Sequence, residues 1–365
     1  MNKHKLLIIN PGSTSTKVAV FEDENIIFED ILRHSVEELK NFNKMYDQMS
    51  FRKEIILRSL YENYIEIDDI DCVVGRGGLL MPIESGTYEV NELMLEHLKI
   101  GYMGEHASNL GGLLAHELVK DTNCKSYIVD PVVVDELQDV ARISGLREIE
   151  RISIFHALNQ KAIAKRHAKL INKKYEELSL IVVHLGGGVS VGAHKNGRVI
   201  DCANALDGEG PFSPERAGTL PVGDLVKLCY SGKYTYDEVK KMITGEGGLV
   251  SYLGTNSAQE ASKRVDDGDE YARLIYYAMA YQIAKEIGAI SAVLKGQVDA
   301  ILLTGGIAYD DMFTGWIKEM ISFIAPVHTY PGEDELKALA EGGLRILRGE
   351  EEAKIYGEGE IEYAI

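Results

Sequence analysis

The residues best suited to chemistry near the start of the chain lie in a short loop between two apolar runs. Leu6–Ile9 and Val18–Phe21 are β-rich, and Gly12 and several hydroxyl residues lie between them. This order predicts a strand, a tight loop and a second strand. Such a corner gathers backbone N–H groups, hydroxyls and an ammonium group, which are the donors that bind an anion. The candidate phosphate-binding residues here are Asn10, Ser13, Ser15 and Lys17.

The same pattern recurs about halfway along the chain. Leu180–Val183 is an apolar run, the loop His184–Gly188 follows, and Val189–Ala193 is the next run. Asn10 and His184 stand at equivalent places in the two repeats, so we expect two similar β-rich domains whose loops bind phosphates across an interdomain cleft. Chance similarity between two strand–turn–strand units is the alternative. The candidate nucleotide-binding residues of the second loop are His184, Gly186, Gly187 and Gly188.

Two charged residues follow predicted strands of the first half. Arg76 lies among glycines after the apolar run 70–74, and Asp130 directly follows the run 125–129. Open α/β sheets place ligand-binding groups at the carboxyl ends of their strands. A surface arginine and an ordinary Asp-Pro turn are equally consistent with these patterns.

Three further side chains lie at or inside predicted helices. His156 stands at a helix entrance, where a core histidine is the alternative to a catalytic one. Ser213 reads as an N-cap, which would place Arg216 in a first helical turn, where the helix dipole does not favour a cation. We therefore expect Arg216 either to form a salt bridge or to bind a ligand. His167 lies among lysines and arginines and is interpreted as a solvated surface residue.

A third glycine turn and an acidic segment complete the set of candidates. Gly305-Gly306 follows the buried run 298–303, and two glycines there let the backbone approach a base or a phosphate. Glu333 precedes the terminal helix, where its role is either capping or an indirect contact with Mg²⁺. No GxxxxGK[ST] motif is present, and Gly186–Gly188 leads into a strand, so neither common nucleotide-binding loop applies.

The composition limits the class of protein. A chain of 365 residues with 45% hydrophobic content suits two domains, and its net charge of −18 argues against a general nucleic-acid or membrane surface. No apolar stretch approaches the roughly 18–20 residues of a membrane span, and the first apolar run is too short for a signal peptide. The four cysteines form no CxxC pair, and a reducing cytoplasm is expected.

Together these motifs resemble the acetate kinase family, which has the actin-like ATPase fold. NPGSTSTK, VVGRGG, Asp130, Phe155-His156, HLGGG, FSPERAG, LLTGGIA and PGEDEL occur in the family's order along essentially the whole chain. The resemblance implies two α/β domains of RNase H-like type: residues 1–152, with 335–365 packing back on them, and 153–334. It also implies reversible, Mg²⁺-dependent transfer of the ATP γ-phosphate to a short-chain carboxylate, and at least a homodimer.

The resemblance also implies roles for individual residues. The carboxylate substrate is already ionised at neutral pH and needs no general base, so the difficulty is repulsion between two anions. His156 would hydrogen-bond the transferred phosphoryl group, and Gly305-Gly306 would border the nucleoside. The charge-neutralising groups would be Arg76, Arg216, His184 and Mg²⁺, with the metal held by Asn10 and Asp130 and, through water, by Glu333.

Three positions depart from the family pattern. Where acetate kinases have Arg-Val-Val-His-Gly-Gly, this chain has Cys72 at the position of the arginine, so Arg76 would have to act from a shifted place. Gly-Thr-Arg is replaced by Gly-Thr-Leu220, which leaves Arg216 as the nearest cation, and HLGNG is replaced by HLGGG. These changes favour butyrate or a branched-chain acid such as isobutyrate over acetate. Leu79, Leu80, Met81 and Phe155 are candidates for the pocket that receives the acyl chain.

Three alternative functions remain open on the sequence. An acetate or propionate kinase would use the same machinery. A sugar or polyol kinase of the same fold would need a general base for its hydroxyl substrate, and Asp130 could supply it. An ATP-driven interaction protein is the non-enzyme alternative, but the sequence has no separate peptide-binding domain or low-complexity tail.

Overall fold

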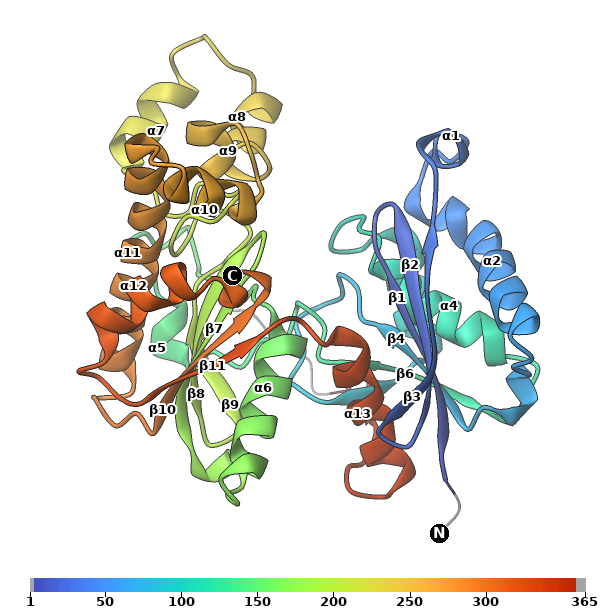
Figure 1. Ribbon diagram of the computed structural model, residues 1–365. Coiled ribbons are helices and arrows are strands. Elements are labelled where there is room, and N and C mark those ends of the chain that lie inside the picture. Colours follow the sequence, from blue (N-terminus) through green and yellow to red (C-terminus); the bar gives the residue numbers. More distant parts are fainter. Residues whose placement is uncertain (1–2, 359–365) are drawn as a thin grey trace. The chain divides into compact units, whose positions relative to one another are not determined.

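The computed structural model describes residues 3–358 and divides into two compact units (Figure 1). Unit 1 contains the described residues up to Val134 together with those from Asp334 onward, and unit 2 is Asp135–Glu333. The division falls earlier than the expected 152/153 because Glu136 forms a buried ion pair with Lys161 at 2.6 Å, which ties this segment to unit 2. Residues 359–365 of the segment expected to pack on the first domain lie outside the described residues.

The described strands of unit 1 form a seven-stranded sheet in the order β12-β5-β6-β4-β1-β2-β3. β1, β2 and β3 form an antiparallel meander, and β4 and β6 extend the sheet parallel to β1. The strand–loop–strand unit predicted around Gly12 is therefore confirmed. The bounds are β1 Lys5–Pro11, β2 Ser15–Glu22, β3 Asn25–Arg33, β4 Cys72–Arg76, β5 Thr87–Glu89, β6 Lys125–Val129 and β12 Lys354–Ile355.

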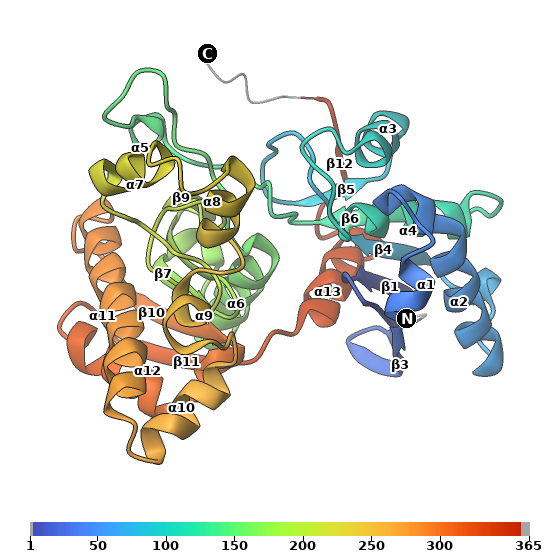
Figure 2. The ribbon, with the colours of Figure 1, turned by 90° about the horizontal axis from the view of Figure 1, so that it is seen from above.

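Helices cover both faces of this sheet, since the side chains of β1 are buried on both faces. Leu7 and Ile9 pack with the helices α2 and α4, whereas Leu6 faces α13. A Cβ on Gly343 of α13 would lie only 2.7 Å from Leu6 Cδ2, so this glycine lets the helix approach the sheet closely (Figure 2). The helices are α1 Val36–Leu39, α2 Met49–Glu62, α3 Glu92–Ile100, α4 Asn109–Val119 and α13 Glu335–Leu347.

Unit 2, all of whose residues are described, has a five-stranded sheet in the order β11-β10-β7-β8-β9. β7, β8 and β9 form an antiparallel meander, and β10 and β11 continue parallel to β7. This is the order that β6, β4, β1, β2 and β3 have in unit 1, so the repeat predicted from the two glycine loops is present in the topology. The bounds are β7 Ser179–Leu185, β8 Val189–Lys195, β9 Arg198–Cys202, β10 Ala300–Gly305 and β11 Val327–Pro331.

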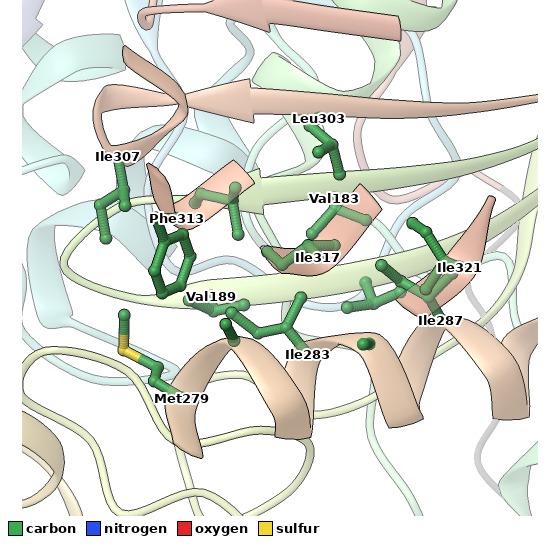
Figure 3. Close-up of a cluster of buried hydrophobic side chains, with 14 of the residues drawn as sticks. Val183, Val189, Met279, Ile283, Ile287, Leu303, Ile307, Phe313, Ile317 and Ile321 are labelled. Atoms are coloured by element: carbon green, nitrogen blue, oxygen red, sulfur yellow. The ribbon is translucent and has the colours of Figure 1, made fainter. Parts of the chain in front are cut away.

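The core of unit 2 lies between its sheet and the long helix α11. Met279, Ile283 and Ile287 recur at helical spacing on α11 and pack against the strands and α12 (Figure 3). The opposite face is covered by α6, whose Ile163 packs on Leu180. The helices are α5 Asp139–Arg142, α6 Ala157–Leu170, α7 Val222–Cys229, α8 Tyr236–Ile243, α9 Gly248–Leu253, α10 Ala258–Asp266, α11 Glu270–Val293 and α12 Asp311–Ile321. Between residues 3 and 358, no helix is both long and apolar enough to cross a bilayer.

Two local interpretations were wrong. Ser213–Arg216 is not helical; Arg216 forms an isolated β-bridge with Thr244, and these long-range contacts override the local capping signal. His167 is buried, because Tyr330 of β11 covers it and the tyrosine hydroxyl lies 2.8 Å from Nδ1. A helix face flanked by charged residues was thus mistaken for a solvated one.

An acidic residue inside unit 2 makes its stability depend on pH. Burial raises the pKa of the Glu286 carboxyl, and the nearby Asp201 and Glu209 raise it further, against the opposing effect of Arg151. A carboxyl whose pKa is raised on folding stabilises the protein while it is protonated, and this contribution is lost as the pH rises through the folded-state pKa.

We therefore expect Glu286→Gln to increase the free energy of unfolding at pH 7–8, and the gain to shrink toward mildly acidic pH. Urea unfolding of the two proteins across that pH range measures the difference. A gain that grows on acidification would contradict the assignment. Glu270→Gln, at an exposed position at the start of the same helix, is the matched control.

Candidate active site

Three of the predicted residues of unit 1 lie at the carboxyl ends of adjacent parallel strands. Ile9 of β1 pairs with Gly75 of β4, and Arg76 pairs with Val129 of β6. Asn10, Arg76 and Asp130 therefore emerge side by side at one edge of the sheet, which is the edge where open α/β sheets bind ligands. Cys72 begins β4 at the opposite end, so Arg76 is the cation that this strand brings to the site.

Arg76 and Asn10 share a carboxylate that the sequence did not single out. Arg76 Nη2 lies 3.0 Å and Nη1 3.2 Å from the two oxygens of Glu335, and Asn10 Nδ2 donates to Glu335 Oε2 at 2.6 Å. Glu335 is the first residue of α13. Glu333, the carboxylate predicted for the metal, instead lies in unit 2, where its Oε1 is 3.2 Å from His184 Nε2. The acidic run in PGEDEL was the only sequence signal, and it did not distinguish these two residues.

The position of Arg76 depends on a contact between glycines. A Cβ on Gly75 or on Gly111 of α4 would overlap the backbone of the other segment, since Gly111 faces the carbonyl of Arg76. A Cβ on Gly78 would likewise overlap Asn109. The glycines around Arg76 thus let α4 pack directly on the strand that ends in the arginine.

We expect Gly111→Ala to lower the free energy of unfolding by about 3 kcal/mol or more, because backbone atoms cannot give way as a side chain can. Chemical denaturation measures the effect. Gly288→Ala on α11 is the matched control: nothing lies within 4 Å of its Cβ, so the helix should be stabilised by up to about 1 kcal/mol. Equal stability of the Gly111 variant and the wild type would contradict the packing described.

Asp130 is buried and held by the loop before β5. Its Oδ1 accepts hydrogen bonds from Ser85 Oγ at 2.6 Å and from Gly86 N at 2.8 Å, and its backbone takes the left-handed conformation with φ of +39°. The two hydrogen bonds to Oδ1 fix the orientation of this carboxylate, which suits a positioning group.

The loop after β1 is held from behind by a buried arginine that sequence reasoning missed. Arg52 of α2 is fully buried and donates to the carbonyl oxygens of Gly12 and Ser13 at 2.9 and 3.2 Å, and to Ser15 O at 3.1 Å. Thr14 O accepts from the backbone of His34. Burial lowers the pKa of Arg52 to about 10, so it remains charged at neutral pH. Arg52 and the backbone N–H of His34 thus engage the carbonyl oxygens of the loop 12–15. The exposed Ser13 and Lys17 lie on this loop and its following strand.

The two predicted histidines of unit 2 lie in contact. His156 is the N-cap of α6 and His184 is near the end of β7, and their rings stack with centroids 3.8 Å apart and 12° between planes. His184 Nδ1 lies 3.0 Å from Asn159 Oδ1, while His156 Nδ1 lies 2.8 Å from Ser190 Oγ. Residues 28 positions apart in sequence thus form one imidazole pair beside the glycine loop.

Arg216 packs on the glycine loop 186–188. A Cβ on Gly188 would collide with its guanidinium group, whose Nη1 donates to Ala205 O at 2.8 Å. Burial lowers the pKa of Arg216, and its Nε has no hydrogen-bond partner among the described residues. A buried donor without a partner is costly, so this cation is suited to receive an anionic ligand.

A cavity of about 650 Å³ opens at the carboxyl ends of the parallel strands of unit 2. Gly186, Gly187 and Gly306 line it, together with Ile307, Asp310 and Glu333. Gly305 has a φ of +95° and lies against Leu185 O, so the turn after β10 requires glycine. Three of the five glycines predicted to bind a nucleotide therefore border one cavity, and this cavity is large enough for a nucleotide.

The residues proposed for a metal do not form a cluster within either unit. Asn10 and Asp130 belong to unit 1, and Glu333 to unit 2. Among residues 3–358, no group of three His, Cys, Asp or Glu side chains is arranged to hold a metal ion. Metal binding by Asn10, Asp130 and Glu333 stays a prediction.

The duplicated topology, with glycine loops and charged groups at the carboxyl ends of parallel strands, defines an α/β protein of the actin-like ATPase fold. Solved structures agree: Porphyromonas gingivalis acetate kinase has a TM-score of 0.79 at 19% identity, covering 94% of this chain and all of that one. The predicted fold class is confirmed.

Sequence comparisons identify the family. A model of the acetokinase family matches residues 148–314. Butyrate kinase 1 and Butyrate kinase 2 of Clostridium acetobutylicum are 61% and 60% identical to this chain, each over 97% of it and 99% of the relative. The chain belongs to the acetokinase family.

Proposed function

We propose that this protein is a butyrate kinase, which transfers the γ-phosphoryl group of ATP to butyrate or a related short or branched carboxylate and forms an acyl phosphate and ADP. The observation that carries this proposal is the identity of 61% to Butyrate kinase 1 over nearly the whole length of both chains. The cavity bordered by glycines and the charged strand ends are consistent with this chemistry.

In unit 2 the cavity holds ATP. Gly305-Gly306 borders the nucleoside, and the loop Gly186–Gly188 approaches the phosphates with its backbone. A Cβ on Gly186 would meet the imidazole of His184, and one on Gly188 the guanidinium group of Arg216. Arg216 and His184 neutralise phosphate charge, and His156 donates a hydrogen bond to the phosphoryl group in transfer.

In unit 1 the strand ends bind the carboxylate and the transferred phosphoryl group. Arg76 supplies positive charge, and the loop that carries Ser13, Ser15 and Lys17 contacts phosphate oxygens. Asn10 and Asp130, the predicted metal residues of unit 1, and Glu335, which lies beside Asn10, offer the hard oxygen donors that Mg²⁺ prefers. Since Glu335 already balances Arg76 and Asp130 already accepts two hydrogen bonds, these residues fit a metal that keeps water ligands rather than one bound directly by all three. When bound, Mg²⁺ supplies further charge neutralisation.

The step needs no proton transfer. A carboxylate oxygen attacks the γ-phosphorus, the bond to the bridging oxygen of ATP breaks, and ADP leaves with the electron pair. Because nucleophile and electrophile are both anionic, charge neutralisation carries most of the catalysis. A sugar or polyol kinase would need a base instead, and Asp130 Oδ1 is already engaged by Ser85 and Gly86.

Trapping of the acyl phosphate with hydroxylamine tests the proposal. The purified protein is incubated with ATP, Mg²⁺ and each acid from acetate to valerate, including isobutyrate, and the hydroxamate is measured. We expect the largest yield with butyrate or isobutyrate. A maximum at acetate or propionate would indicate the related acetate or propionate kinase activity, and no hydroxamate with any acid would overturn the carboxylate kinase assignment.

We further propose that the protein acts in the cytoplasm as a homodimer or a larger homo-oligomer. The four cysteines of the chain are not paired in disulfides, and Cys72 and Cys202 are buried, which fits a reducing compartment. Tyr271, Leu274 and Tyr281 form an exposed apolar stripe along α11, which fits a contact between copies. Light scattering after size-exclusion chromatography measures the assembly, and a monomer at micromolar concentration would contradict it.

A further inference from the structure

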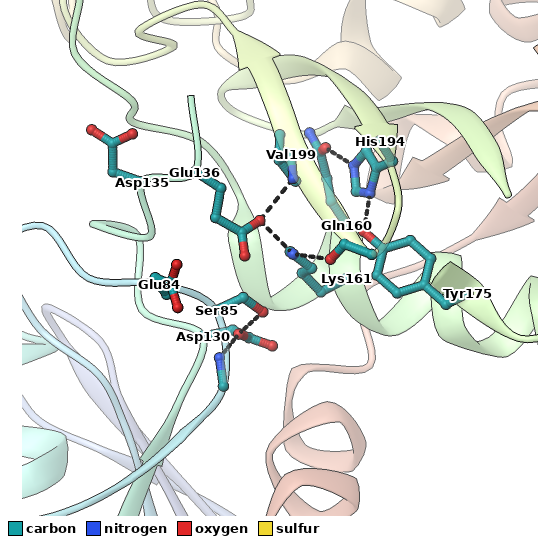
Figure 4. Close-up of polar contacts among 12 residues, drawn as sticks. Glu84, Ser85, Asp130, Asp135, Glu136, Gln160, Lys161, Tyr175, His194 and Val199 are labelled. Carbon is teal, nitrogen blue, oxygen red and sulfur yellow. Dashed lines mark hydrogen bonds and ion pairs between the residues drawn. The ribbon is translucent and has the colours of Figure 1, made fainter. Parts of the chain in front are cut away.

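A chain of polar side chains leads from His156 into the interior of unit 2. His156 Nδ1 lies 2.8 Å from Ser190 Oγ, which lies 2.8 Å from Gln160 Nε2. Gln160 Oε1 is 2.9 Å from His194 Nε2, and His194 Nδ1 is 2.7 Å from the hydroxyl of Tyr175 (Figure 4). The function proposed above uses only the first residue of this chain.

One backbone group determines which atoms donate and which accept in this chain of hydrogen bonds. The carbonyl of Ser190 lies 3.2 Å from Gln160 Nε2, and a carbonyl oxygen can only accept a hydrogen bond. The side-chain amide of Gln160 must therefore turn its NH₂ group toward Ser190 and its oxygen toward His194. This orientation is consistent with both neighbours of the amide.

At the far end of this chain of hydrogen bonds, His194 and Tyr175 donate and accept in the same direction. His194 is fully buried, and burial lowers the pKa of its imidazole well below the usual value, so the ring is neutral. Nε2 of His194 carries the proton and donates to Gln160 Oε1, so Nδ1 accepts from the hydroxyl of Tyr175. Every member of the chain then has a matching donor or acceptor.

At the end near His156, the partners of Ser190 determine which atom accepts the hydrogen bond from its hydroxyl group. Ser190 Oγ accepts from Gln160 Nε2 at 2.8 Å and from the backbone N–H of His156 at 3.4 Å. With its two lone pairs engaged, the hydroxyl donates its own proton to the remaining neighbour, His156 Nδ1. An imidazole that accepts at Nδ1 carries its proton on Nε2.

We infer that Ser190 is a positioning residue that holds His156 as the neutral tautomer protonated on Nε2, and that Gln160 imposes this direction on the serine. The ring stacked on His184 then presents an N–H donor, not a lone pair, at the nitrogen farther from Ser190. This inference rests on the proposed function for its catalytic meaning, because an N–H at Nε2 is what a phosphoryl oxygen requires. The tautomer itself is measurable without turnover.

Nitrogen-15 spectra of the full-length protein labelled at histidine test the inference. The His156 signals are assigned by their loss in His156→Asn. We expect a pyridine-type shift at Nδ1 and a pyrrole-type shift with a bound proton at Nε2. The reverse pattern, or a doubly protonated ring at neutral pH, would overturn the inference.

The most informative variant is Gln160→Glu. It keeps the shape of the side chain but replaces the NH₂ donor with a carboxylate, which only accepts hydrogen bonds. The hydroxyl of Ser190 should then turn to the carboxylate, and His156 should take the proton on Nδ1. Tyr175→Phe is the matched control at the far end, where the Ser190 carbonyl still orients Gln160, so the tautomer of His156 should stay as in the wild type. A Gln160→Glu spectrum identical to that of the wild type would contradict the chain.

Ser190→Ala separates the inference from the proposed function. We expect mixed tautomers at His156 and a loss of kcat of roughly 10–100-fold, with the KM for ATP changed less than about 2-fold. Altered tautomers with an unchanged kcat would overturn the positioning role. If the wild type shows the expected tautomer but forms no hydroxamate from any acid, the proposed function fails while the structural assignment stands.

Discussion

Replacement of Arg76 by alanine is expected to lower kcat for acyl phosphate formation by about 10²–10³ while the protein remains folded. The guanidinium group lies at the carboxyl end of β4, is partly exposed, and forms a bidentate ion pair with Glu335. Without it, Glu335 keeps its negative charge beside Asn10, so the site loses a cation and retains an uncompensated anion. Steady-state kinetics with butyrate and circular dichroism measure the two effects.

Arg76→Lys should recover only part of the loss, because an ammonium group cannot make the paired contact with a carboxylate. Arg348→Ala is the matched control, since Arg348 is also in unit 1 and pairs with Asp23 and Glu24 at the surface. Its kinetics should equal those of the wild type. Full activity in a folded Arg76→Ala protein would remove Arg76 from the site.

Replacement of Arg52 by methionine is expected to lower both stability and kcat/KM, although Arg52 contacts no substrate. Three carbonyl oxygens of the loop 12–15 would lose a charged donor, and each such hydrogen bond contributes about 1.5–3 kcal/mol. Allowing for relaxation of the loop, we expect the free energy of unfolding to fall by about 3–5 kcal/mol. The loop would also lose the positive charge behind it, so kcat/KM should fall by roughly 10-fold or more.

The affinity for ADP distinguishes this effect from general damage. The nucleotide cavity is built from residues of unit 2, so calorimetric ADP binding by Arg52→Met at low temperature should stay close to that of the wild type. Arg58→Met changes an exposed arginine of the same helix and should alter neither stability nor rate appreciably. Unchanged kcat/KM in Arg52→Met would exclude a functional role for the loop that this arginine holds.

Much of the fold could be predicted because its signals are local. The apolar runs around Gly12 and Gly186 are short and end at glycine loops, and the structure shows the predicted antiparallel pairs. The places of Arg76 and Asp130 followed from the ends of such runs, because strands that lie parallel in one sheet bring their carboxyl ends to the same edge. His156 was placed at the start of a helix by similar reasoning.

Other features depended on contacts between distant segments. Arg216 was expected in a helix, but its packing on Gly188 and its bridge to Thr244 outweigh the capping signal of Ser213. Arg52 gave no local signal, because the carbonyls that it binds lie 37–40 residues earlier in the chain. The choice of Glu335 over Glu333 beside Asn10 depended on where α13 begins.

By itself, the amino-acid sequence determined the two repeated strand–loop–strand units, the residue types at their carboxyl ends and the family. These properties depend on the order of neighbouring residues along the chain. Only the tertiary structure decided which carboxylate balances Arg76, which arginine supports the loop after β1, and which way the hydrogen bonds run from Tyr175 to His156. Each of these depends on the distance and orientation between groups far apart in sequence, and hydrogen bonds and ion pairs act only over a few ångströms.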